Sequence, residues 1–110
     1  MTLWAVVPVK PLPQAKSRLA NVLTEAERVE LSRWMLSRTL EVLAEVREIS
    51  ATLVVSADPD VLELATAAGG VALPEPDPPN LNRALLLARE AARAAGASAV
   101  LVLSADLPRL

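Results

Sequence analysis

Residues 53–59 read Leu-Val-Val-Ser-Ala-Asp-Pro, and this stretch indicates how the chain folds. It belongs to an apolar, β-branched run at residues 52–57 that is typical of a buried strand. Asp58 and Pro59 supply an N-cap and a first-turn proline, which predict a helix that continues to about residue 68. A strand that passes directly into a helix is the unit of α/β folds.

A similar sequence, Leu-Val-Leu-Ser-Ala-Asp, follows at residues 101–106 and indicates a recurring strand end rather than an internal repeat. Apolar runs at residues 3–9 and 99–103 predict two more strands, and residues 71–73 predict a weak one. Strands that alternate with helical segments predict an α/β fold with a doubly wound, mostly parallel sheet and right-handed crossovers. The common strand order 3-2-1-4 would place the first and fourth strands side by side.

The first helix is predicted from its start signal and its apolar period. Thr24 and Glu27 form a capping-box pattern after a loop that follows the first strand. The apolar stripe is expected at Leu31, Met35, Val42 and Val46, widened by Leu36, Leu40 and Leu43. Trp4 and Trp34 are the two aromatic residues, and both are expected to lie in an otherwise aliphatic core.

Glycine and asparagine residues mark the ends of the other helices. The second helix is expected to end at residues 69–70, which are both glycine. Asn80 or Asn82 is expected to cap the third helix, which closes at Gly96. Residues 74–79 contain four prolines and predict an irregular loop.

The composition excludes several classes of protein. The 110 residues carry 11 Lys and Arg against 13 Asp and Glu, a formal net charge of -2, which argues against a nucleic-acid partner. Without Cys or His, the chain has no disulfide, thiol or imidazole metal site, or Ser-His or Cys-His pair. No apolar run reaches the roughly 20 residues of a membrane span, and no signal peptide is recognisable. We expect one cytoplasmic domain over residues 1–110 with no membrane partner.

Charged residues that follow the first and fourth strands form a candidate site. Lys10, Lys16 and Arg18 follow the first strand, and Asp106 follows the fourth. With the order 3-2-1-4, these residues would face each other across the crevice where open α/β sheets bind ligands. Cations opposite a carboxylate suit a polyphosphate bound with Mg²⁺. The structural alternative is that the cations are merely solvated and that Asp106 belongs to a turn or cap.

Several segments resemble one enzyme family. They are Val-Pro-Val-Lys at residues 7–10, Ala-Lys-Ser-Arg-Leu at 15–19, Val-Val-Ser-Ala-Asp-Pro at 54–59, Leu-Asn-Arg-Ala-Leu at 81–85, and Ala-Asp-Leu-Pro at 105–108 after the fourth strand. Together they resemble the 2-phospho-L-lactate guanylyltransferase family, whose bacterial relatives act on phosphoenolpyruvate. The opening signature, formed by residues 7–10 and 15–19, is fairly specific, whereas Asp-Leu-Pro after a strand is shared by many nucleotidyltransferases.

The resemblance implies a nucleotide-diphosphosugar-transferase-like fold of the GT-A type and a Mg²⁺-dependent step of deazaflavin coenzyme biosynthesis. GTP would be the donor, and phosphoenolpyruvate or 2-phospho-L-lactate the acceptor. Carried over by position, the triphosphate would be held by Lys10, Lys16 and Arg18, and Lys16 and Arg18 are also the catalytic candidates. Asp106 would bind the metal. Asn82 would lie near the nucleoside, and Asp58 would be a weaker candidate for the same side. For Asp58, and for one of Asn80 and Asn82, helix capping is the competing interpretation.

The chain also departs from the family pattern. Ser104 stands where many relatives have glycine or proline, and family members continue for about as many residues again. The resemblance therefore predicts a truncated chain, with a further metal-binding acid and most of the acceptor pocket in the missing half. Incomplete or absent turnover is expected from residues 1–110 alone.

Three alternatives remain open. The first is a related nucleotidyltransferase of the molybdenum-cofactor or sugar-nucleotide type. The molybdenum-cofactor group usually has a glycine-rich turn after its first strand, whereas this chain has Lys-Pro-Leu-Pro at residues 10–13. A receiver-type signalling module needs clustered carboxylates at that place, where this chain has Lys10. A non-catalytic half-domain would leave an unpaired sheet edge, which predicts aggregation or a homodimer.

Overall fold

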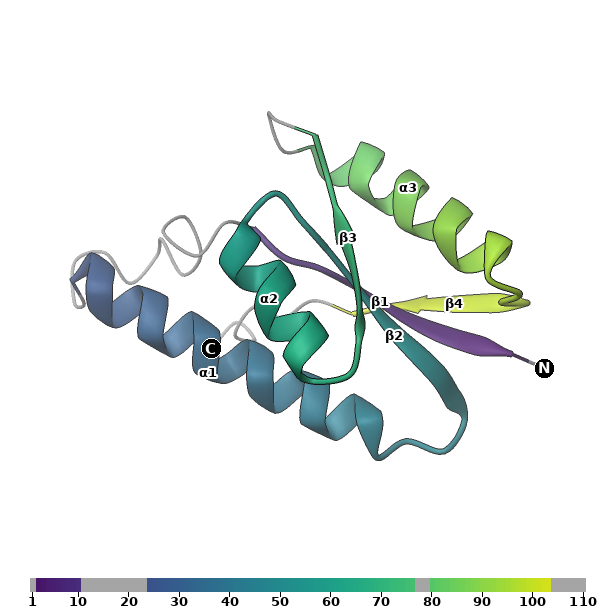
Figure 1. Ribbon diagram of the computed structural model, residues 1–110, viewed down its shortest axis with the longest axis horizontal. Helices are drawn as coiled ribbons and strands as arrows, with labels where there is room; N and C mark the ends of the chain where they lie inside the picture. Colours follow the sequence, from purple (N-terminus) through teal and green to yellow (C-terminus); the bar gives the residue numbers. More distant parts are fainter. Residues whose placement is uncertain (1, 11–23, 77–79, 104–110) are drawn as a thin grey trace.

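The structure, a computed structural model, describes residues 2–10, 24–76 and 80–103. Within these residues the elements follow in the order β1 (Leu3–Pro8), α1 (Glu25–Ala44), β2 (Ile49–Ser56), α2 (Pro59–Ala67), β3 (Val71–Pro74), α3 (Leu81–Ala94) and β4 (Ala99–Val102). All described strands are parallel, and their order is β3-β2-β1-β4. Helices α1 and α2 lie on one face of the sheet and α3 on the other (Figure 1). The predicted α/β class and strand order are confirmed.

Strand β1 lies between two partners and is buried on both faces. Val6 is in register with Leu53 of β2 and with Val102 of β4. Ala5 and Val7 pack with Leu36, Leu40 and Leu43 of α1, whereas Val6 packs with Ala84 and Ala88 of α3. This double burial explains why the strand sequence is continuously apolar instead of alternating.

The predicted capping box at the start of α1 is confirmed. The Glu27 backbone N–H donates to the Thr24 hydroxyl oxygen over 3.1 Å, and the Thr24 backbone N–H donates to Glu27 Oε1 over 2.8 Å. Two of the N–H groups that a helix start leaves without an intrahelical acceptor are thereby satisfied.

The predicted centre of the α1 stripe is wrong. The buried residues of α1 are Ser32, Leu36, Leu40 and Leu43, and Val42 is 51% exposed. The buried face of α1 is therefore centred on Leu36, Leu40 and Leu43, which the sequence places only at the border of the apolar stripe. Trp34 is 60% exposed, so its predicted core position is also wrong. Trp34 is two positions from Leu36 in the sequence, so the two side chains point about 200° apart around the helix axis and lie on nearly opposite faces.

Trp4, by contrast, is partly buried and packs against the cluster formed by β1, β2 and α3, in line with its predicted core position.

None of the helices in the described ranges has the length and apolar character to cross a membrane.

The predicted helix ends are largely confirmed. Asp58 caps α2 with Pro59 in its first turn, and Gly69 follows the helix with φ +85°. Gly96 has φ +101° after α3. Only glycine adopts this left-handed region at little cost, which explains both stops.

Pro74 does not begin an irregular loop, as the sequence predicts, but is the last residue of β3. It is in register with Ser56 of β2. A proline is tolerated there because β3 lies at the edge of the described sheet, where its missing N–H is needed by no outer neighbour.

We expect Leu36→Ala to lower the free energy of unfolding by about 2–5 kcal/mol, because Leu36 is fully enclosed between α1 and the sheet. Trp34→Ala removes a larger side chain from an exposed position and is expected to change it by about 0.5 kcal/mol or less. Urea unfolding of both variants measures the difference. Equal losses would show that Trp34 contributes to the core after all.

The stability of α1 should depend on pH through Glu27. The Thr24 backbone N–H and then its hydroxyl lower the pKa of the Glu27 carboxyl below its ordinary value of 4.5. Since the pKa is lower in the folded state, the stabilisation is present above pH 4.5 and is lost as the pH falls through the lowered folded-state pKa. Thermal unfolding should show wild type and Glu27→Gln converging below pH 4.5, whereas Glu48→Gln serves as an exposed control. A gap that does not narrow would contradict this assignment.

Candidate functional site

The carboxyl edge of the sheet brings three strand ends together. The Val9 N–H donates to the Val55 carbonyl over 3.0 Å, which extends the pairing of β1 with β2 beyond Pro8. On the other side of β1, the Leu103 N–H donates to the Val6 carbonyl over 2.9 Å. The strand order reverses at β1, so the edge has the topology at which open α/β sheets bind ligands.

The structure places one of the predicted phosphate-binding cations at this edge. Lys10 is exposed and lies directly beyond the paired end of β1. Lys16, Arg18 and Asp106 lie outside the described residues. Their convergence with Lys10 therefore stays a prediction, supported by the neighbouring positions of β1 and β4 in the sheet.

Asp58 has the structural role that the sequence favours for it. Its side chain is 9% exposed, and a carboxylate oxygen accepts a hydrogen bond from the Asp60 backbone N–H over 2.9 Å. The backbone N–H of Asp58 donates to the buried hydroxyl of Ser56 over 3.1 Å. This carboxylate therefore fixes the turn from β2 into α2. Contact with a nucleoside stays a prediction for this residue.

The structure decides which asparagine caps α3. The Asn80 side-chain oxygen accepts from the Arg83 backbone N–H over 3.0 Å, so Asn80 is the N-cap. Asn82 is the second residue of the helix, is exposed, and has no side-chain hydrogen bond within the described part of the chain. Its carboxamide is exposed, and its contact with a nucleoside stays a prediction.

Two residues without a role predicted from the sequence also shape this edge. Glu75 follows β3, and its Oε2 accepts from the Asn80 backbone N–H over 3.3 Å. Arg83 donates from Nη2 to the Pro76 carbonyl oxygen over 2.8 Å. These bonds join the segment after β3 to the start of α3. The only sequence signal is an acid placed five residues before the capping asparagine, which is too common to be diagnostic.

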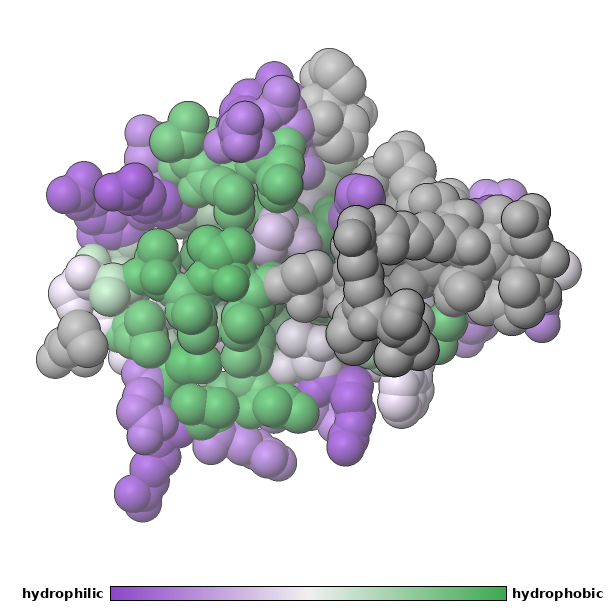
Figure 2. Space-filling view, turned by 180° about the vertical axis from the view of Figure 1, so that it is seen from behind, coloured by the Kyte–Doolittle hydropathy of each residue, from purple (hydrophilic) through white to green (hydrophobic). Residues whose placement is uncertain are grey.

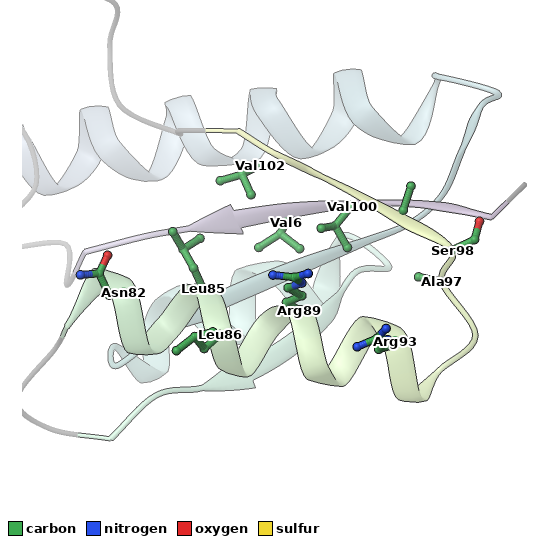
Figure 3. A pocket seen from close by; sticks show the side chains of 11 residues that line it. Val6, Asn82, Leu85, Leu86, Arg89, Arg93, Ala97, Ser98, Val100 and Val102 are labelled. Atoms are coloured by element: carbon green, nitrogen blue, oxygen red, sulfur yellow. The ribbon is translucent and has the colours of Figure 1, made fainter.

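A groove runs between α3 and β4, and we call it the α3–β4 groove (Figure 3). Its volume is about 660 Å³, and its lining comprises Val6, Asn82, Leu85, Leu86, Arg89, Arg93, residues 97–100 and Val102. Of the predicted site residues that the structure describes, Asn82 lines the groove, whereas Lys10 and Asp58 do not. The groove and the carboxyl edge therefore meet at the N-terminal end of α3.

The described residues do not form a metal centre on their own. Among them, no three acidic side chains come together as a metal-binding group. The Asp58 carboxylate is already engaged as a helix cap. The predicted Mg²⁺ site therefore depends on Asp106, which lies outside the described ranges.

Comparisons with known proteins point to one family. The family model described as "Guanylyl transferase CofC like" matches residues 3–110. A phosphoenolpyruvate guanylyltransferase of Sphaerobacter thermophilus is 44% identical over 108 residues, which are 98% of this chain and 52% of that protein. A 2-phospho-L-lactate guanylyltransferase of Methanobrevibacter smithii is 31% identical over 106 residues, covering 96% of this chain and 46% of the relative. The chain thus spans about half the length of these curated relatives.

A solved structure confirms the type of fold. The crystal structure described as a nucleotide-diphospho-sugar transferase from Desulfovibrio desulfuricans G20 superposes with a TM-score of 0.73 at 19% identity. The match covers 100% of this chain and 50% of the other. The predicted nucleotide-diphosphosugar-transferase-like architecture is therefore confirmed, and here too the match ends at half of the larger protein.

Capping and charge at Asp58 can be separated by two substitutions. Asp58→Ala removes the acceptor for the Asp60 N–H and should cost about 1 kcal/mol of unfolding free energy. Asp58→Asn keeps a side-chain oxygen at the same place and should cost only a few tenths of a kcal/mol, because Asn caps as well as Asp. Chemical denaturation of the two variants provides the measurement. If Asn proves as damaging as Ala, the negative charge and not the cap is what the fold requires.

Proposed function

Because the chain belongs to the CofC-like guanylyl transferase family, we propose that the protein transfers GMP from GTP to a phosphorylated small acid and releases pyrophosphate. The observation that carries the proposal is the family match over residues 3–110. Phosphoenolpyruvate is the favoured acceptor, since the relative named for it is 44% identical, against 31% for the relative named for 2-phospho-L-lactate. The step would belong to deazaflavin coenzyme biosynthesis.

The topology supports a nucleotide at the carboxyl edge. Lys10 is exposed beyond β1, at the point where the strand order reverses. Asn82 opens α3 at the same edge with its side-chain amide available. We assign the triphosphate to the β1 side, with Lys10, Lys16 and Arg18, and the guanosine to the side of Asn82. A cation beside the phosphate oxygens stabilises the negative charge that develops on the pyrophosphate leaving group during the reaction.

The proposed reaction suits a chain without Cys or His. The acceptor is a phosphate monoester with a second pKa near ~6, so it is mostly a dianion at neutral pH. One of its oxygens attacks the α-phosphorus of GTP, and the bond from that phosphorus to the oxygen bridging to the β-phosphorus breaks. Pyrophosphate leaves with the electron pair. No proton has to be removed from the nucleophile, so positioning and charge neutralisation suffice.

We assign Asp106 as the carboxylate that binds Mg²⁺. A strand-end carboxylate with phosphate oxygens is the donor set that this ion prefers. When bound, Mg²⁺ would neutralise charge on the phosphate groups. The cations of this chain would act on the same phosphates: Lys10 as a point charge and Arg18 through two parallel hydrogen bonds.

Two substitutions test the assignments in a chain of the relatives' length that carries residues 1–110 of this sequence. Asp106→Asn should lower the rate of pyrophosphate release by on the order of 10²-fold or more without unfolding the protein. Lys16→Ala should mainly raise the KM for GTP, because it removes a phosphate contact. Arg47→Ala, an exposed cation in the turn before β2, is the control. Wild-type kinetics for Asp106→Asn and Lys16→Ala would refute the site.

A further inference from the structure

Two charged side chains hold the connection from β3 to α3. Glu75 follows β3, and its Oε2 accepts a hydrogen bond from the Asn80 backbone N–H over 3.3 Å. Arg83, in the first turn of α3, donates from Nη2 to the Pro76 carbonyl oxygen over 2.8 Å. One side chain thus reaches forward to the helix and the other reaches back from it. Because one partner in each bond is ionised, these bonds are stronger than neutral ones and fix the start of α3 relative to the end of β3.

Further hydrogen bonds connect this pair to the buried end of β2. The Glu75 backbone N–H donates to the Ser56 carbonyl oxygen over 3.0 Å. Ser56 is fully buried, and its hydroxyl accepts from the Asp58 backbone N–H over 3.1 Å. Through Glu75 and Ser56, the start of α3 is therefore connected to the interior of the sheet at its carboxyl edge.

The contacts beneath α3 hold the helix in a different way. Its buried residues are Ala84, Ala88 and Ala92, and the first two pack in one cluster with Val6. Figure 2 shows a broad hydrophobic area on the side of the molecule where Figure 1 places α3 and β4. Apolar contact is non-directional, so it keeps the helix on the sheet without setting a unique place along it. The hydrogen bonds at the start of α3 therefore decide where along the sheet the helix begins.

Asn82 is the candidate site residue whose place depends on these bonds. It lies between the N-cap Asn80 and Arg83, at the start of the helix (Figure 3). Its side chain is exposed and has no hydrogen bond to another residue of the described chain. The place of the carboxamide is therefore set by the backbone of residues 80–83, which Glu75 holds at one end and Arg83 at the other.

We propose that Glu75 and Arg83 are positioning residues for the nucleoside of the bound nucleotide. By holding residues 80–83 against the end of β3, they fix the place at which the Asn82 carboxamide meets the nucleoside. The inference rests on the proposed function, in which the guanosine lies on the side of Asn82 and the triphosphate on the side of Lys10. A polar group that is held in place before the ligand arrives binds it more tightly, because less freedom is lost on binding.

A role in stability alone makes a different prediction. A bond that merely stabilises the fold changes the fraction of folded protein, so its loss affects every ligand of the site alike. A positioning role weakens the binding of ligands that carry a nucleoside and spares those that lack one. Inorganic tripolyphosphate provides the comparison, since it has the phosphate chain of GTP without the nucleoside.

Calorimetric titration in the presence of Mg²⁺ tests the proposal, in the chain of the relatives' length that carries residues 1–110 of this sequence. Arg83→Ala should weaken GTP binding about tenfold and change the dissociation constant of tripolyphosphate by less than about twofold. Arg83→Lys should recover most of the GTP affinity, because an ammonium group can still donate to the Pro76 carbonyl oxygen. Arg93→Ala is the matched control, since it removes the same charge from the last turn of α3, and it should change neither constant.

Glu75 provides a second pair of variants, which keeps the test decisive where Arg83→Ala does not fold. Glu75→Gln retains a side-chain oxygen that can accept from the Asn80 N–H and should bind GTP as wild type does. Glu75→Leu removes the acceptor and should weaken GTP binding about fivefold, again with little change for tripolyphosphate.

A double-mutant cycle shows whether the effect of Arg83 passes through Asn82. Asn82→Ala should itself weaken GTP binding. Adding Arg83→Ala should weaken it further by about twofold or less, because the carboxamide that Arg83 positions is already gone. In steady-state kinetics, Arg83→Ala should raise the KM for GTP about tenfold and leave kcat within about threefold of wild type.

Three results would overturn the proposal while the proposed reaction stands. They are equal weakening of GTP and tripolyphosphate binding by Arg83→Ala, wild-type GTP affinity in both Arg83→Ala and Glu75→Leu, and full additivity of Arg83→Ala with Asn82→Ala. A wild-type protein that neither binds GTP nor releases pyrophosphate would instead contradict the proposed function, and this inference with it.

Discussion

The pairing of β1 with a parallel partner on each side is the interaction on which the rest of the structure depends. Val6 lies between Leu53 and Val102 in the sheet. Because β1 directs Ala5 and Val7 to one face and Val6 to the other, both faces of the strand must be covered. Parallel neighbours require crossover helices, and these supply α1 and α2 on one face and α3 on the other. The same arrangement makes β1 the point of strand reversal and places Lys10 at its carboxyl end.

Local signals in the sequence were sufficient for the order of elements but not for the orientation of α1. Capping at Thr24 and Asp58 depends on residues only two or three positions apart, so it could be predicted. The apolar residues of α1 cover more of its circumference than the sheet can bury. Only packing decides that Leu36, Leu40 and Leu43 face inward while Val42 and Trp34 stay exposed.

The candidate site shows the same limit. Its location follows from topology, because parallel strands end at one edge and the order 3-2-1-4 brings β1 next to β4. The roles of single residues do not follow, since Asn80 and Asn82 are equally good caps in sequence and differ only in where α3 begins. The hydrogen bonds of Glu75 with Asn80 and of Arg83 with Pro76 join residues on the two sides of positions 77–79 in the sequence. The sequence pattern on either side does not indicate which residues form these pairs.

The place of Asn82 at the carboxyl edge and the α3–β4 groove are both consequences of how α3 packs. Ala84 and Ala88 are small enough to let the helix approach Val6, Leu53 and Val55 closely, which fixes α3 over β1 and β2. That position directs Asn82 to the carboxyl edge and leaves Leu86, Arg89 and Arg93 beside β4, which among the described strands pairs with β1 alone. Because the anchoring contacts lie toward the centre of the sheet, the shape of the groove is set by the packing of α3 on β1 and β2.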